Sequence, residues 1–298
     1  MVGTFRSGFV TIIGRPNVGK STLMNLYIGH KISIISDKPQ TTRNKISGML
    51  TSDDYQVIFI DTPGIHKPTS KLGQYMVKTA QNAMNEVDCV VYMVEPRPRA
   101  NADTRIINRL GNIGTPVFLV INKADTVPKQ ELLPVIADYQ KMYNFSEVFL
   151  TSALKAEGTM ELLDAIKNVL PEGPKYFPDD EITDQPERQI VSELIREKVL
   201  LFMREEVPHG VAVAIDQMTA REGQDLVDVY ATIYADKDSH KGMLIGKDGA
   251  MLKRIGQTAR VDIEHLLGSP VNLQLWVKVK KEWRNSDFYI RNFGFTDS

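Results

Sequence analysis

An eight-residue stretch near the start of the chain, GRPNVGKS at residues 14–21, constrains the fold most strongly. It follows the apolar run FVTII and precedes STLMNLYIG, whose spacing is typical of a helix. A Gly-x-x-x-x-Gly-Lys-Ser loop between a strand and a helix is typical of a phosphate-binding loop, whose backbone N–H groups surround phosphate oxygens. We expect the side chain of Lys20 to neutralise those oxygens and Ser21 to ligate Mg²⁺. The residues expected around the phosphates are Gly14, Arg15, Pro16, Asn17, Val18, Gly19, Lys20, Ser21 and Thr22.

Short apolar runs rich in β-branched residues recur through the first half of the chain and indicate buried strands. They begin at residues 9, 56, 88, 116 and 147. Helical patterns lie between several of them, beginning at residues 71, 131 and 159. This alternation predicts an α/β domain with a mostly parallel, doubly wound sheet.

The second half of the chain has a different order of elements, so we expect two domains, which suits a length of 298 residues. The segment PEGPKYFPDDEITDQP, residues 171–186, contains four prolines and a cluster of acids, as linkers often do. We therefore predict a nucleotide-binding domain over 1–172, a linker over 173–186 and a smaller α+β domain over 187–298.

The motif NKAD, residues 122–125, points to guanine as the base. The carboxylate of Asp125 only accepts hydrogen bonds, so it can pair with N1–H and the exocyclic amine of guanine, whereas adenine presents an acceptor there. We expect Asn122 and Lys123 to complete this site. The segment SAL follows the next strand and would contact the guanine through Ser152, Ala153 and Leu154.

Two further motifs, TTR at residues 41–43 and DTPG at 61–64, occur in the order that a GTPase requires. Asp61 follows a predicted strand and can hold Mg²⁺ through a bound water, while the Gly64 N–H can reach a γ-phosphate. A threonine of TTR can complete Mg²⁺ coordination, and the residues alone do not separate Thr41 from Thr42.

Together, GRPNVGKS, TTR, DTPG, NKAD and SAL resemble the motifs of the translation-factor-related small GTPases. Within that class, the stretches PNVGKSTLMN, PQTTRNKI and DTPGIHKP resemble the Era family of bacterial GTPases. The resemblance implies Mg²⁺-dependent GTP hydrolysis in which Lys20, Thr42 and Gly64 assist, with Thr42 rather than Thr41 as the metal ligand. Ile65 replaces the glutamine that orients water in Ras-like GTPases, so intrinsic hydrolysis should be slow. The resemblance also implies a K⁺ ion beside Asn17; an ordinary turn is the other interpretation of that residue.

A second glycine motif, Gly-Lys-Asp-Gly at residues 246–249, lacks the spacing of another nucleotide loop. The surrounding order of helices and strands resembles a type II KH domain, in which such a loop holds the backbone of single-stranded RNA. Asp248 would repel phosphate, although it could also cap the following helix. The residues that this resemblance assigns to RNA are Ile245, Gly246, Lys247, Asp248, Gly249, Lys253, Arg254 and Arg260.

We expect a GTP-driven RNA-binding switch, in which GTP and Mg²⁺ order the segments around Thr42 and Gly64 and so expose or occlude the RNA-binding surface. The Era resemblance implies that the RNA is small-subunit ribosomal RNA near its 3′ end and that the protein acts in assembly of the 30S subunit. The alternative is a membrane-associated signalling GTPase that acts through protein partners. A net charge of −1 favours neither function, because a basic surface can be local. The single cysteine, Cys89, and the lack of a signal peptide indicate the cytoplasm, with peripheral membrane association compatible with the family.

Overall fold

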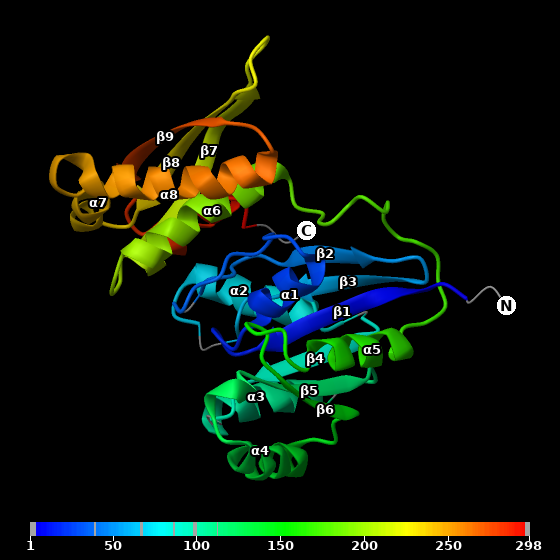
Figure 1. Ribbon diagram of the computed structural model, residues 1–298. Helices are drawn as coiled ribbons and strands as arrows, with labels where there is room; N and C mark the ends of the chain where they lie inside the picture. Colours follow the sequence, from blue (N-terminus) through cyan, green and yellow to red (C-terminus); the bar gives the residue numbers. More distant parts are fainter. Residues whose placement is uncertain are drawn as a thin grey trace. The chain divides into compact units, whose positions relative to one another are not determined.

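A computed structural model describes residues 4–38, 40–65, 68–85, 87–97, 100–111 and 113–295 (Figure 1). The first half of the chain builds a sheet with the strand order β2-β3-β1-β4-β5-β6. All neighbouring pairs are parallel except β2 and β3, which are antiparallel. The strands are β1 (Arg6–Gly14), β2 (Ile46–Thr51), β3 (Tyr55–Asp61), β4 (Cys89–Val94), β5 (Val117–Asn122) and β6 (Glu147–Thr151).

Helices cover both faces of this sheet because its strands are apolar on both sides (Figure 1). One face packs against α1 (Lys20–Ile28) and α5 (Thr159–Val169). The other face packs against α2 (Lys71–Asn82), α3 (Ala100–Leu110) and α4 (Lys129–Met142). The prediction of a mostly parallel, doubly wound sheet is confirmed.

The parallel strands end at one edge of the sheet, where ligands of such folds bind. The phosphate loop follows β1, DTPG begins on the last residue of β3, NKAD begins on the last residue of β5, and SAL follows β6. The predicted motifs are therefore brought together by topology. The antiparallel edge strand β2 was absent from the predicted strands, since its run ISGMLT mixes polar residues and glycine with apolar ones.

The second half of the chain forms a small mixed sheet with helices on one face (Figure 1). Strands β7 and β8 are antiparallel, and β8 and β9 are parallel. Apolar residues of α6 and α8 pack on the strands, including Ile255, Ala259 and Ile263, as their helical spacing predicts. The elements are α6 (Glu187–Phe202), β7 (Val211–Ala220), β8 (Val227–Ala235), α7 (Asp238–Ile245), α8 (Ala250–Leu267), β9 (Val271–Val279) and α9 (Asp287–Asn292). Short 3₁₀ turns are η1 (Ala124–Thr126), η2 (Pro208–Gly210), η3 (Lys247–Gly249) and η4 (Trp283–Asn285).

Packing divides the chain into two units whose bounds differ from a simple cut at the linker. Most of the proline-rich segment belongs to the first unit, which extends to Asp184. For example, the Oε1 atom of Gln56 on β3 accepts hydrogen bonds from the backbone N–H groups of Tyr176 and Phe177. Two earlier stretches, Ile34–Thr41 and Thr69–Gln74, cluster with the second unit. The proposed limits of the linker at 173 and 186 stay a prediction.

The burial of Cys89 and of the C-terminal aromatic residues indicates their roles. Burial raises the pKa of the Cys89 thiol to about 12, so this cysteine is inert at neutral pH. The indole of Trp283 is buried and its Nε1–H donates to the carbonyl of Gly210, whereas Phe288 is 66% exposed. Among the described residues, no helix has both the length and the apolar character needed to cross a bilayer.

Candidate functional site

The phosphate loop is largely buried, and its lysine donates hydrogen bonds to carbonyls of the same loop. Lys20, the first residue of α1, is 6% exposed, and its Nζ donates to the carbonyl of Arg15 at 3.0 Å and to that of Gly14 at 3.4 Å. Burial lowers the pKa of Lys20 to about 8, and the negative charge of Asp61 opposes this shift. A phosphate placed against the loop would give this desolvated ammonium an anionic acceptor, which is stronger than a carbonyl.

The side chain of Arg15 anchors the phosphate loop to α3. It is 6% exposed, and its Nε lies 3.0 Å from Oδ1 of Asp103 on α3. Two tyrosine hydroxyls donate to the same carboxylate, from Tyr92 at 3.1 Å and from Tyr139 at 2.8 Å. Because a buried carboxylate with several donors has a fixed orientation, it fixes Arg15, whose carbonyl in turn accepts from Lys20. Asp103 is a residue that the sequence analysis did not identify.

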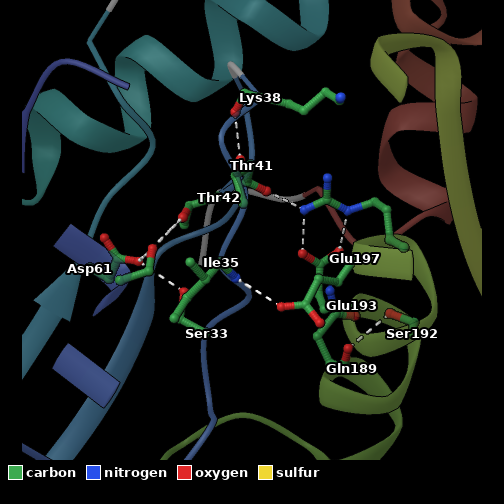
Figure 2. Close-up of polar contacts among 12 residues, drawn as sticks. Ser33, Ile35, Lys38, Thr41, Thr42, Asp61, Gln189, Ser192, Glu193 and Glu197 are labelled. Carbon is green, nitrogen blue, oxygen red and sulfur yellow. Dashed lines mark hydrogen bonds and ion pairs between the residues drawn. The ribbon is translucent and has the colours of Figure 1, made fainter. Parts of the chain in front are cut away.

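A cluster of hydroxyls surrounds Asp61 at the end of β3 (Figure 2). Its Oδ2 accepts hydrogen bonds from Ser21 at 2.7 Å, Ser33 at 2.9 Å and Thr42 at 3.2 Å. Its Oδ1 is buried and has no hydrogen-bond partner. Burial raises the pKa of Asp61, while Lys20 and the three hydroxyls oppose the shift. Serine, threonine and carboxylate oxygens in this arrangement suit Mg²⁺, which prefers oxygen ligands, so the residues present fit the metal that the motifs imply.

The structure places the two threonines of TTR in different environments. The Thr42 hydroxyl lies in the Asp61 cluster, 3.1 Å from that of Ser21. The Thr41 hydroxyl instead donates to the carbonyl of Lys38 at 2.6 Å (Figure 2). This geometry favours Thr42 as the metal ligand.

The DTPG segment is packed closely against the phosphate loop. A Cβ atom on Gly64 would lie 2.6 Å from the backbone nitrogen of Pro16, so only glycine fits there. The next residue, Ile65, donates its N–H to the carbonyl of Gly14 at 3.2 Å, and its side chain is buried in the core. Ile65 therefore packs and offers nothing that could orient water.

Asn122 connects the parts of the guanine site rather than facing outwards. Its Nδ2 donates to the carbonyl of Val18 at 2.8 Å. Its Oδ1 accepts from the hydroxyl of Thr151 and from the N–H of Ala153. The amide thus holds the phosphate loop and the SAL segment in one arrangement.

Lys123 makes a second connection to the phosphate loop. Its backbone is left-handed, with φ 61°, and its Nζ donates to the carbonyl of Asn17 at 2.7 Å. The same ammonium pairs with Glu95, which follows β4, at 2.5 Å. Glu95 is the second residue that the sequence analysis did not identify, because a lone glutamate after a strand carries no recognisable pattern.

Asp125 is held in one orientation by neighbouring side chains. Hydrogen bonds from Lys155, and next from Ser152, hold the pKa of its carboxyl below the usual range. Lys155 lies 3.0 Å from Oδ2, so the carboxylate is ionised and oriented, as an acceptor for guanine must be. Leu154 is 87% exposed, which leaves its side chain available to cover a base. Lys155 adjoins the predicted SAL residues and is the third residue missed.

The glycine loop of the second unit is exposed and lies between α7 and α8. Gly246 and Gly249 have φ of 72° and 77°, so both occupy the left-handed region that favours glycine. Asp248 also has positive φ, 51°, and makes no capping hydrogen bond; the residue at the N-cap of α8 is Gly249. The alternative in which Asp248 caps this helix is therefore wrong for this structure.

The basic residues predicted to meet RNA lie along the exposed side of the loop and of α8. Lys247 and Lys253 are exposed. The guanidinium of Arg254 lies 4.2 Å from the centre of the Phe202 ring, and Arg260 pairs loosely with Glu264 at 3.6 Å. Ile245 ends α7 and is partly buried against the core. Lys247, Lys253 and Arg254 lie at or near the start of α8, where backbone N–H groups can bind phosphate, whereas Arg260 lies in the middle of that helix.

Comparisons with known proteins match both units. A family model described as a 50S ribosome-binding GTPase matches residues 9–123, and a KH domain model matches residues 206–284. GTPase Era of Clostridioides difficile (strain 630) is 55% identical over 295 residues, covering 98% of this chain and 99% of that protein. GTPase Era of Alkaliphilus oremlandii (strain OhILAs) is 56% identical over 293 residues, with the same coverage.

Solved structures agree over the whole length. A variant of Aquifex aeolicus Era bound to GDP·AlF₄⁻ has a TM-score of 0.94 at 39% identity, and covers 98% of this chain and 100% of its own. Era in complex with MgGDPNP and nucleotides 1506–1542 of 16S ribosomal RNA has a TM-score of 0.93, with the same identity and coverage. The phosphate loop, the guanine motif and the KH unit thus occur together in one chain, which belongs to the Era family of GTPases.

Proposed function

We propose that this GTPase binds the 3′ end of small-subunit ribosomal RNA through its KH unit and acts in assembly of the 30S subunit. The observation that supports the GTPase site is the Asp61 cluster, in which Ser21 and Thr42 converge on one carboxylate oxygen. The support for the RNA is the similar Era structure that holds a 16S ribosomal RNA fragment and a GTP analogue.

Each residue of the nucleotide site has a proposed role. Lys20 binds the β- and γ-phosphates, Ser21 and Thr42 ligate Mg²⁺, and Asp61 holds the metal through bound water. The N–H of Gly64 contacts the γ-phosphate. Mg²⁺, when bound, neutralises the charge that develops on the phosphate oxygens during hydrolysis. Asp125 selects guanine over adenine, because its ionised carboxylate accepts two hydrogen bonds that adenine cannot donate.

A monovalent cation is part of this proposal. Because Ile65 cannot orient the attacking water, added charge stabilisation at the phosphates must contribute more to the rate of hydrolysis. Asn17 has a left-handed backbone, with φ 66°, and its carbonyl accepts from Lys123. We assign K⁺ to the side chain of Asn17. GTP hydrolysis should be faster in KCl than in NaCl at equal ionic strength, and equal rates would remove K⁺ from the account.

The proposed place of action is the cytoplasm, with peripheral association at the inner face of the cell membrane. The competing function, a signalling GTPase acting through protein partners, differs in what the second unit should bind. Its glycine loop decides between them, because glycine allows main chain to approach a phosphate backbone and a bulky acid does not.

The test is a pair of substitutions, Gly246→Asp and Gly249→Asp, made together. Binding to nucleotides 1506–1542 of 16S ribosomal RNA should fall by at least about tenfold. Aspartate is strained at the positive φ of these two positions, and the two added negative charges repel the phosphates. Affinity for GTP should stay within twofold of wild type and controls for the first unit, while the melting temperature controls for the second. Unchanged RNA binding by a variant that still binds GTP would favour the protein-partner function.

A further inference from the structure

The segment Ile34–Thr41 has contacts that GTP binding alone does not require. In the sequence it lies between α1 and β2, yet its packing assigns it to the second unit. Its covalent neighbours, Ser33 and Thr42, belong to the first unit, and both donate to Oδ2 of Asp61. Both ends of this short segment are therefore attached to residues of the proposed Mg²⁺ site.

Both ends of the segment contact charged side chains of α6. The N–H of Ile35 donates to Oε1 of Glu197 at 3.0 Å (Figure 2). Nη2 of Arg196 donates to the carbonyl of Thr41. Arg196 is 1% exposed, and Glu193 accepts from its Nε at 2.8 Å, so the guanidinium has one fixed orientation. Hydrogen bonds between charged groups and backbone in such surroundings are stronger than those in water.

A continuous chain of ion pairs leads from Glu197 to the helix that follows the glycine loop. Oε2 of Glu197 accepts from Nζ of Lys198 at 2.7 Å, and the same Nζ lies 2.5 Å from Oδ2 of Asp262 on α8. The side chains of Glu197 and Lys198 are 8% and 7% exposed. Because α8 begins next to Gly249, a displacement of this helix by bound RNA would reach Asp262.

The contacts with Asp61 and the contacts with α6 are linked by two peptide bonds, which join Ser33 to Ile34 and Thr41 to Thr42. Every hydrogen bond and ion pair described above lies inside one unit, and the chain itself makes the connection. A Mg²⁺ ion held by the Thr42 hydroxyl would compete with the hydrogen bond that this hydroxyl donates to Asp61. Because Thr42 is covalently bonded to Thr41, a shift of Thr42 would act directly on the end of the segment that Arg196 contacts.

We infer that Glu197, Lys198 and Asp262 are positioning residues that couple RNA binding at α8 to the nucleotide site through Ile34–Thr41. The inference rests on the proposed RNA-binding function and names its route inside the molecule. Coupling of this kind is reciprocal: GTP changes RNA affinity by the same factor as RNA changes GTP affinity. A network of contacts carries such coupling when it contains an element with two arrangements, here the segment between Ser33 and Thr42.

The coupling is measured as a ratio of two dissociation constants for nucleotides 1506–1542 of 16S ribosomal RNA, one with GDP and one with a non-hydrolysable GTP analogue. For the wild type we expect a ratio in the range of about 5 to 150. Glu197→Ala should lower the ratio at least threefold, because Ile35 and Lys198 both lose their partner. Asp262→Asn should lower it as well, since it removes only the charge at the α8 end.

Three controls separate positioning from folding. Asp138→Asn removes one member of an exposed ion pair with Lys141 on α4 and should leave the ratio unchanged. Melting temperature and the affinity for GDP report the fold, and a purely structural ion pair would change these while leaving the ratio alone. Glu197→Gln keeps an acceptor for Ile35, so it should retain more coupling than Glu197→Ala.

The outcomes are distinct. A wild-type ratio of one would overturn the nucleotide-dependent switch and this inference with it. A wild-type ratio above five that survives within twofold in both Glu197→Ala and Asp262→Asn would overturn the inference and leave the proposed function standing. Loss of coupling in Glu197→Ala alone would overturn the role of α8.

Discussion

The two glycine loops of this chain have opposite surroundings. The phosphate loop is buried, and the side chains of Asn122 and Lys123 hold two of its carbonyls. The loop at 246–249 exposes Lys247 and Asp248, and backbone hydrogen bonds stabilise it, from the N–H of Gly246 to the carbonyl of Gly242 at 2.9 Å and from that of Gly249 to the carbonyl of Gly246 at 3.4 Å. A preformed, braced loop suits a small ligand that must be bound in one geometry, whereas an open loop admits a polymer that enters and leaves along its length.

Replacement of Lys20 should have the largest effect on the phosphate loop while leaving the RNA loop unaffected. Replacing Lys20 with Ala removes the buried ammonium, and charged hydrogen bonds are worth about 1.5–3 kcal/mol each. GTP affinity should fall by about 100-fold or more in equilibrium titration. RNA binding without nucleotide should remain at the wild-type value, and a parallel loss of RNA binding would show that the two loops are not separate sites.

The bracing of the phosphate loop is tested at Asp103, which does not reach the nucleotide. Asp103→Asn leaves the guanidinium of Arg15 buried without its counter-charge, a change that costs about 3–5 kcal/mol of stability in comparable buried pairs. We expect a lower melting temperature and a GTP affinity reduced by about tenfold, because the Arg15 carbonyl shifts. Full GTP affinity in a destabilised variant would mean that the brace supports the fold and not the loop.

The pH should affect only one of the loops. Burial disfavours the charge of Lys20 and lowers its pKa to about 8. Bound phosphate favours the charged form of Lys20. Above pH 8, nucleotide binding therefore requires uptake of a proton by Lys20, and GTP affinity falls as the pH rises. Between pH 7.5 and 8.8 we expect a decrease of several-fold in GTP affinity and little change in RNA affinity. A GTP affinity that stays constant over this range would contradict the proposed role of the Lys20 charge.

The smallest effect is expected at Asp248, which places a negative charge and a left-handed backbone in the RNA loop. Asp248→Asn removes the charge, and asparagine tolerates positive φ at least as well as aspartate. RNA should bind about two- to fivefold more tightly at low salt, with a smaller gain at high salt, since the repulsion is screened. Weaker binding would indicate that the carboxylate itself contacts RNA.

The fold and the nucleotide motifs could be predicted because each depends on local spacing. A phosphate loop needs its glycines, Lys20 and Ser21 within eight positions, and alternating apolar runs reveal buried strands. Asp103, Glu95 and Lys155 could not be predicted, because each is a single charged residue whose meaning depends on a partner far away in the sequence. The same holds for Ile34–Thr41: its polar sequence suggests a loop, and only the contacts with Glu197 and Arg196 reveal what holds it.

The central claim is that the nucleotide at the first loop controls the RNA affinity of the second. The most direct test is the dissociation constant of the wild-type chain for nucleotides 1506–1542 of 16S ribosomal RNA, measured by filter binding with GDP and with a non-hydrolysable GTP analogue. The account predicts that RNA binds in both states and at least about fivefold more tightly with the GTP analogue. Equal dissociation constants would contradict the claim, leaving a GTPase and an RNA-binding unit that act independently.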